Sequence, residues 1–99
     1  MKKNNKLTGK IPISIFLEGK MYIVYSPALD LSSCGETVEE AQSNFSEAAH
    51  IFFEECLKKN TLDDVLESLG WVHSKQGWTP IQVIKNDYID ANRYLELVS

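Results

Sequence analysis

Apolar residues recur at helical spacing along one stretch of the chain, and this stripe constrains the fold more than any other sequence feature. Thr37 is followed three positions later by Glu40, the pattern of a capping box in which the hydroxyl accepts a helix N–H. The stripe predicts about five helical turns that begin at this cap. Such a helix needs a sheet or another helix to cover its apolar face. Its members are Val38, Ala41, Phe45, Ala48, Phe52 and Cys56.

Two runs rich in β-branched and aromatic residues precede the predicted helix. Residues 10–18 and 21–26 are separated only by Gly19-Lys20, so we expect an antiparallel hairpin. A third short strand is expected around 31–34. The order of these segments predicts an α+β fold: a small antiparallel sheet of three to four strands, packed by one long helix in the order β-β-β-α-β.

The chain after the long helix carries further signals. Thr61 can cap a short second helix over 62–69, and Gly70 occupies the position at which helices commonly end. A tight hairpin is expected between Trp71 and Trp78, whose indoles we assign to the core of a small sheet.

The chain divides into three parts. Residues 1–9 are expected to form a flexible basic arm, and residues 10–80 the α+β domain. Residues 81–99 form a C-terminal tail. Alternation at Ile81 and Val83 favours a strand there, while the later spacing fits either a helix or a strand, and the tail is a candidate for self-association.

Charge is distributed unevenly along the chain. The net charge of the 99 residues is −4, but the first ten residues carry four lysines and no acid, so the remainder has six bases against fourteen acids. Such a body repels nucleic-acid phosphates and attracts a basic partner. No apolar run reaches the ~20 residues of a membrane span, and two cysteines are too few for a disulfide scaffold. We therefore expect a cytoplasmic protein with free thiols.

An ordered set of short motifs surrounds the start of the long helix. Pro27-Ala28-Leu29 follows the second strand, Gly35-Glu36-Thr37 precedes the helix, and Glu39-Glu40-Ala41, Asn44 and Glu47-Ala48 lie along it. Pro27 fixes the exit from the strand, and Gly35 is expected to adopt a positive φ. Ala41 and Ala48 allow the helix to approach the sheet closely. In this order and spacing, the set resembles the HicB-like antitoxin family.

The resemblance implies a partial ribonuclease-H-like fold and a non-enzymatic antitoxin. Members neutralise a small basic RNA-cleaving toxin of the HicA type in a type II toxin–antitoxin system, often as dimers or tetramers. Many also carry a C-terminal DNA-binding domain, but only residues 81–99 follow Pro80, which is too little for one, so direct DNA binding is disfavoured. The acidic residues expected to face the toxin are Asp30, Glu36, Glu39, Glu40 and Glu47.

Three other interpretations compete with this one. A nuclease would need converging carboxylates to bind divalent metal, with Glu18, Asp30 and Glu47 as candidates, but surface charge explains them better. A cysteine nucleophile would need Cys34 or Cys56 beside His50 or His73, although Cys56 fits the core stripe. The main alternative is a stand-alone transcriptional regulator or nucleic-acid-binding module that uses Lys2, Lys3, Lys6 and Lys10. We expect no catalytic residue, metal or cofactor.

Overall fold

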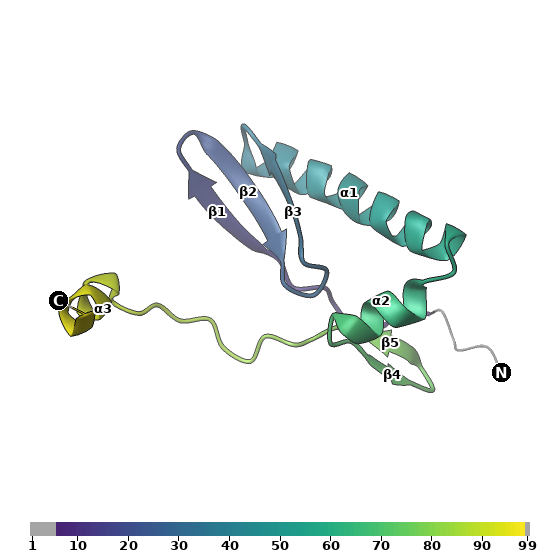
Figure 1. Ribbon diagram of the computed structural model, residues 1–99. Helices are drawn as coiled ribbons and strands as arrows, with labels where there is room; N and C mark the ends of the chain where they lie inside the picture. Colours follow the sequence, from purple (N-terminus) through teal and green to yellow (C-terminus); the bar gives the residue numbers. More distant parts are fainter. Residues whose placement is uncertain (1–5, 99) are drawn as a thin grey trace.

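A three-stranded antiparallel sheet and one long helix form the larger part of the α+β fold, as expected (Figure 1). The computed structural model describes residues 6–98. Two short helices and a two-stranded sheet complete the structure. The elements are β1 (Ser14–Glu18), β2 (Met21–Ser26), β3 (Leu31–Gly35), α1 (Val38–Lys58), α2 (Leu62–Ser68), β4 (Val72–Ser74), β5 (Gly77–Thr79) and α3 (Ala91–Val98).

The two faces of the larger sheet have different environments. Directly opposed residues of antiparallel strands point to the same face, so the register assigns every side chain to one of two sets. The covered face is directed toward α1 and includes Ile15, Val24 and Ser33, which are paired across the sheet. The open face lies on the other side and consists of Ser14, Phe16, Glu18, Met21, Ile23, Tyr25, Ser32 and Cys34.

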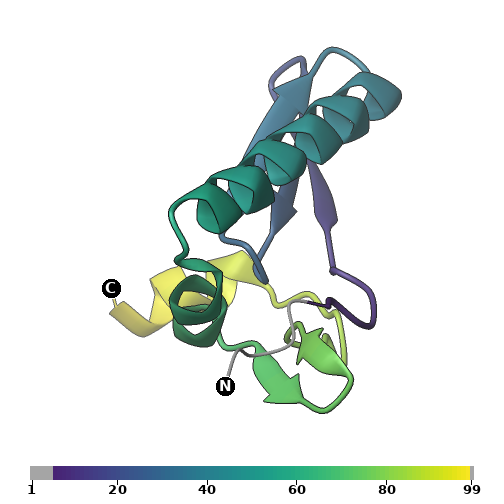
Figure 2. The same cartoon turned by 90° about the vertical axis from the view of Figure 1, so that its right-hand side faces the viewer.

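Helix α1 crosses the covered face and packs on β3 and β2, but makes little contact with β1 (Figure 2). Its N-cap is the expected one, because the Thr37 hydroxyl accepts the Glu40 N–H at 3.0 Å. Ala41 and Phe45 are buried and belong to the same core cluster as Val24 of β2. The predicted stripe therefore does bury the helix on the sheet. β1 remains an edge strand with exposed apolar side chains on both faces.

Gly35 is needed here for a different reason from the one that its sequence position suggested. It is not among the residues with positive φ, so that expectation is wrong. Instead, a Cβ at this position would lie 2.5 Å from the Ala41 nitrogen and 2.9 Å from the Glu40 carbonyl carbon. The missing side chain allows the backbone of β3 to approach the first turn of α1.

The two tryptophans join the second half of the chain to the first. The Trp71 indole N–H donates to the Ala28 carbonyl at 2.7 Å, and the Trp78 indole N–H donates to the Asp63 carboxylate at 3.0 Å. Both indoles are buried, as the sequence indicated. Gly70, with φ +89°, ends α2 as expected. The expected Thr61 cap is wrong, since its side chain makes no capping hydrogen bond.

Residues 6–8 lie against β5. The backbone N–H of Trp78 donates to the Lys6 carbonyl, and the backbone N–H of Thr8 donates to the Trp78 carbonyl, both at 2.8 Å. Leu7 also forms a parallel bridge with Trp78. The end of the expected N-terminal arm is thus attached to β5 by backbone hydrogen bonds. Residues 1–5 of that arm lie outside the described residues.

The chain after Pro80 leaves the body of the protein. Residues 82–90 are exposed and have no regular secondary structure, although the alternation at Ile81 and Val83 predicted a strand. The strand is absent because no strand within residues 6–98 pairs with the segment. The helical alternative for the last residues is confirmed by α3, whose described side chains are all exposed. No helix within residues 6–98 is both long and apolar enough to cross a bilayer.

Candidate protein-binding groove

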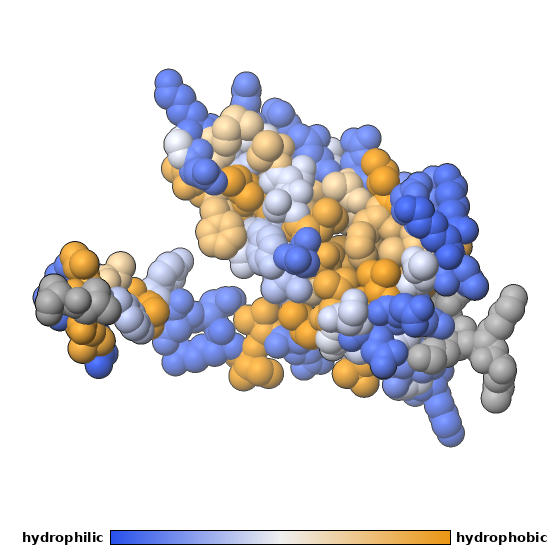
Figure 3. Space-filling view, viewed as in Figure 1, coloured by the Kyte–Doolittle hydropathy of each residue, from blue (hydrophilic) through white to orange (hydrophobic). Residues whose placement is uncertain are grey.

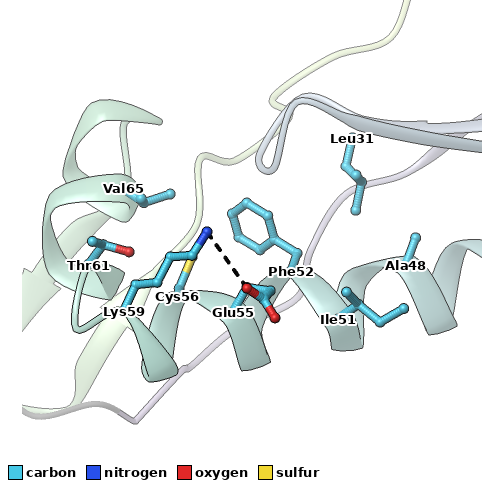
Figure 4. Close-up of a pocket in the computed structure, with 9 residues that line it drawn as sticks. All are labelled: Leu31, Ala48, Ile51, Phe52, Glu55, Cys56, Lys59, Thr61 and Val65. Atoms are coloured by element: carbon cyan, nitrogen blue, oxygen red, sulfur yellow. Dashed lines mark ion pairs between the residues drawn. The ribbon is translucent and has the colours of Figure 1, made fainter.

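A groove of about 460 Å³ lies where α1, α2 and the start of β3 meet (Figure 4). Its floor is apolar. Phe52 of α1 and Leu31 of β3 both extend into the space between the helix and the strand, and Val65 of α2 lies at one end. The Glu55–Lys59 ion pair, 3.7 Å between charged atoms, lies on the rim. The groove is lined by Leu31, Ala48, Ile51, Phe52, Glu55, Cys56, Lys59, Thr61 and Val65.

Ile51 is the most accessible apolar side chain of the groove. It lies on α1 but outside the buried stripe, and 53% of its surface is exposed. Leu57, on the same helix, is exposed to almost the same extent (54%) but is not part of the groove. An exposed isoleucine beside an apolar floor is a common feature of surfaces that bind other proteins.

An acidic row extends from the groove toward the start of α1. Residues three or four positions apart lie on the same side of a helix, so Glu40, Asn44, Glu47, Ile51 and Glu55 form one line. The Asn44 side chain donates to the Cys34 carbonyl at 2.9 Å, which places this line beside β3. We call Glu40, Glu47 and Glu55 the acidic row.

The electrostatic balance around the groove is strongly negative. Residues 36–67 contain nine acidic and two basic side chains. Both lysines are engaged within α1, Lys58 with Glu54 at 3.1 Å and Lys59 with Glu55 at 3.7 Å. Within the described part of the chain, Glu40 and Glu47 form no ion pair, and both are exposed. Part of the uncompensated negative charge therefore lies on the acidic row that leads to the groove.

The structure separates the five acidic residues that the sequence proposed. Glu40 and Glu47 lie together on the acidic row, and Glu36 precedes the helix. Glu39 is on another flank of α1, because it is one residue away from Glu40 and hence about 100° around the helix. Asp30 is directed to the open face, where its carboxylate accepts a hydrogen bond from the Tyr25 hydroxyl at 3.1 Å. This hydrogen bond, with a smaller contribution from burial, raises the pKa of Tyr25 above its ordinary value.

The candidate groups for catalysis are dispersed. Cys34 is exposed on the open face, whereas Cys56 is buried in the core and contributes to the groove, as its place in the stripe indicated. His50 contacts Glu54 on the surface of α1, and His73 packs edge-on against Trp78. Among residues 6–98, no group of three or more His, Cys, Asp or Glu side chains is placed to hold a metal ion.

The apolar floor of the groove is the part of the site that sequence reasoning missed. In the sequence, Ile51 only widens the apolar stripe of the helix. That its side chain is exposed beside the groove can be recognised only once the burial of α1 is known. Comparisons of the chain with protein-family models, with curated proteins and with solved structures found no match.

Proposed function

We propose that this protein is a non-enzymatic, antitoxin-like binding protein that covers a small basic RNA-cleaving toxin through the groove and the acidic row. The observation that carries the proposal is the combination of exposed Ile51, an apolar floor and the exposed carboxylates of Glu40 and Glu47 on one side of α1. A partner that fits would insert an apolar side chain into the groove and place lysines or arginines along the acidic row.

The chemistry of an RNA-cleaving protein fits this surface. RNA is a polyanion, so a protein that binds it presents lysine and arginine side chains around its active site. An acidic surface competes with the RNA phosphates for the same basic groups. Covering the active site of such a toxin would therefore inhibit it without any reaction by the covering protein.

Two further features support the proposal. The sheet-then-helix order agrees with the partial ribonuclease-H-like fold that the HicB-like resemblance implies, and the free thiols suit a protein of the reducing cytoplasm. The alternative, a nucleic-acid-binding module, fits less well, because the acid excess over residues 36–67 repels phosphate.

The test is co-expression with the protein encoded by the adjacent reading frame, followed by co-purification and growth rescue. Ile51→Lys should weaken the complex by roughly 10- to 100-fold, since it removes an apolar anchor and opposes a basic partner. Leu57→Lys is the matched control, because it makes the same change on the same helix at equal exposure but outside the groove. Raising the salt concentration should also slow association.

Three results would contradict the proposal. One is equal loss of binding with Leu57→Lys and Ile51→Lys, which would place the interface elsewhere. Another is cleavage of RNA by the purified protein alone. The third is tight binding of operator DNA at physiological ionic strength without a partner.

A further inference from the structure

The protein exposes far more surface than a compact chain of its mass. Its accessible surface is 7774 Å², whereas a folded monomer of 11.2 kDa exposes about 5,700 Å². The radius of gyration is 16.7 Å, against roughly 12.6 Å for a compact chain of this length. The excess of about 2,000 Å² exceeds the ~800 Å² that each partner contributes to an interface of standard size.

The C-terminal arm, residues 81–98, contributes to this excess, because residues 82–97 are all exposed. The arm departs on the side of the sheet away from α1 and carries α3 at its end (Figure 1). Tyr88 is 97% exposed and Ile84 is 90% exposed, so these side chains are hardly covered by the rest of the described chain. Helix α3 has apolar side chains on one side and Asn92, Arg93 and Glu96 on the other, which is the pattern of a helix that packs on another surface.

The open face of the sheet is the second part of the excess surface. It presents Phe16, which is 53% exposed, together with Met21 and the half-buried Ile23 and Tyr25. Within residues 6–98, no strand pairs with the outer edge of β1, and the apolar centre of β1 contains neither lysine nor proline, the residues that usually protect such an edge. Apolar side chains therefore surround an edge that is able to accept another strand.

A cleft lies between the arm and β1, the edge strand of the larger sheet. It has a volume of about 470 Å³ and is lined by Ser14, Ile15 and Phe16 on the sheet and by residues 86–88 on the arm. Figure 3 shows it as the gap between the sheet and the projecting arm. At about 30 Å³ per water molecule, the cleft has room for side chains from another molecule.

We propose that a second copy of this chain fills the cleft, with the two arms exchanged between the protomers. One chain carries both an apolar arm and an apolar face to receive it. A two-fold axis places each arm of the dimer on the open face of the partner. Both arms and both open faces are then covered. The extended part of the arm then lies along the free edge of β1, and α3 packs beyond it.

The charges favour this face over the groove as the place where the arm docks. The arm has two basic and three acidic side chains, so its net charge is −1, whereas the hairpin over residues 10–26 has two lysines and one glutamate. Residues 36–67 have a net charge of −7 and would repel the arm. The groove is thus left for a different, basic partner, and the two interfaces can be tested independently.

Sedimentation of the full-length protein at micromolar concentration tests the proposal. The expected species has twice the 11.2 kDa mass of the chain. Tyr88→Asp and Phe16→Asp should each weaken the dimer by about tenfold or more, because an apolar side chain at the interface becomes charged. Tyr88 is almost fully exposed in the single chain, so Tyr88→Asp should not alter the urea unfolding of the monomer. Val72→Asp on β4 is the matched control, since Val72 is 66% exposed and outside the cleft.

Cross-linking distinguishes exchange between chains from closure of the arm on its own sheet. Phe16→Cys and Tyr88→Cys are made as separate proteins in a Cys34→Ser background and then mixed with a short bismaleimide. Exchange gives a heterodimeric product. A monomer at every concentration, a dimer that resists both aspartate variants, or a cross-link only within a chain carrying both cysteines would each overturn the proposal.

Discussion

The close approach of α1 to β3 at Gly35 makes a quantitative prediction. In Gly35→Ala, the new methyl group would lie 2.5 Å from the Ala41 nitrogen, although ordinary contacts begin near 3.4 Å. The neighbouring atoms belong to the helix backbone, so no side chain can rotate away. The start of α1 would have to move outward by about 1 Å, which disturbs the burial of Ala41 and Phe45.

The expected cost is about 3 kcal/mol of the free energy of unfolding, at the upper end of the range for an overpacked core. A chain of this length has a total stability of roughly 5–15 kcal/mol, so the variant should still fold. Urea unfolding followed by the fluorescence of Trp71 and Trp78, both buried, measures the change. With a slope of about 1.5 kcal/mol per molar urea, the midpoint should fall by about 2 M.

Gly19→Ala is the control for loss of glycine as such. Gly19 has φ +61°, and no atom lies within 4 Å of the place that a methyl group would take, so its substitution costs only the backbone strain, about 1 kcal/mol. Should Gly35→Ala destabilise the protein no more than Gly19→Ala, the helix would not be held against the strand as described.

Three further predictions concern single contacts. Thr37→Ala removes the cap of α1 and should lower the free energy of unfolding by about 1 kcal/mol, while Thr61→Ala, which removes no capping bond, should change it far less; urea titration compares them. Trp71→Phe leaves a buried carbonyl without its donor and should cost about 2 kcal/mol, measured by circular dichroism; a change below half of that would contradict the contact. Asp30→Asn should lower the pKa of Tyr25 toward its ordinary value, which absorbance titration detects. Because the folded-state pKa of Tyr25 is raised, its hydrogen bond favours folding below the unfolded-state pKa, and this contribution is lost as the pH rises through the folded-state pKa; an unchanged titration in the variant would refute the cause assigned.

Local signals in the sequence were sufficient for most of the architecture. The cap at Thr37, the stripe that follows it and the turn at Gly19-Lys20 predicted the hairpin and the long helix, because these elements depend on neighbours within a few residues. The predicted cap at Thr61 was wrong, because a threonine hydroxyl at the start of a helix does not have to accept a hydrogen bond from a helix N–H. The strand expected at Ile81 failed because strands depend on a partner from elsewhere in the chain.

The candidate site was only partly accessible from the sequence. An excess of acid on α1 was visible, but its division between the acidic row and other surfaces needed the orientation of the helix. Asp30 illustrates the difficulty, because its left-handed backbone and the Tyr25 hydroxyl direct it to the opposite side of the sheet.

By itself, the order of residues determined which segments are helix and strand, that one helix face is buried, and that the region after the first ten residues is anionic. Tertiary structure alone decided that α1 covers β2 and β3 but leaves β1 exposed, and that the arm projects away from the body. The physical reason is that periodicity specifies which side of an element is apolar, whereas what covers that side depends on residues far away in the chain or in another molecule.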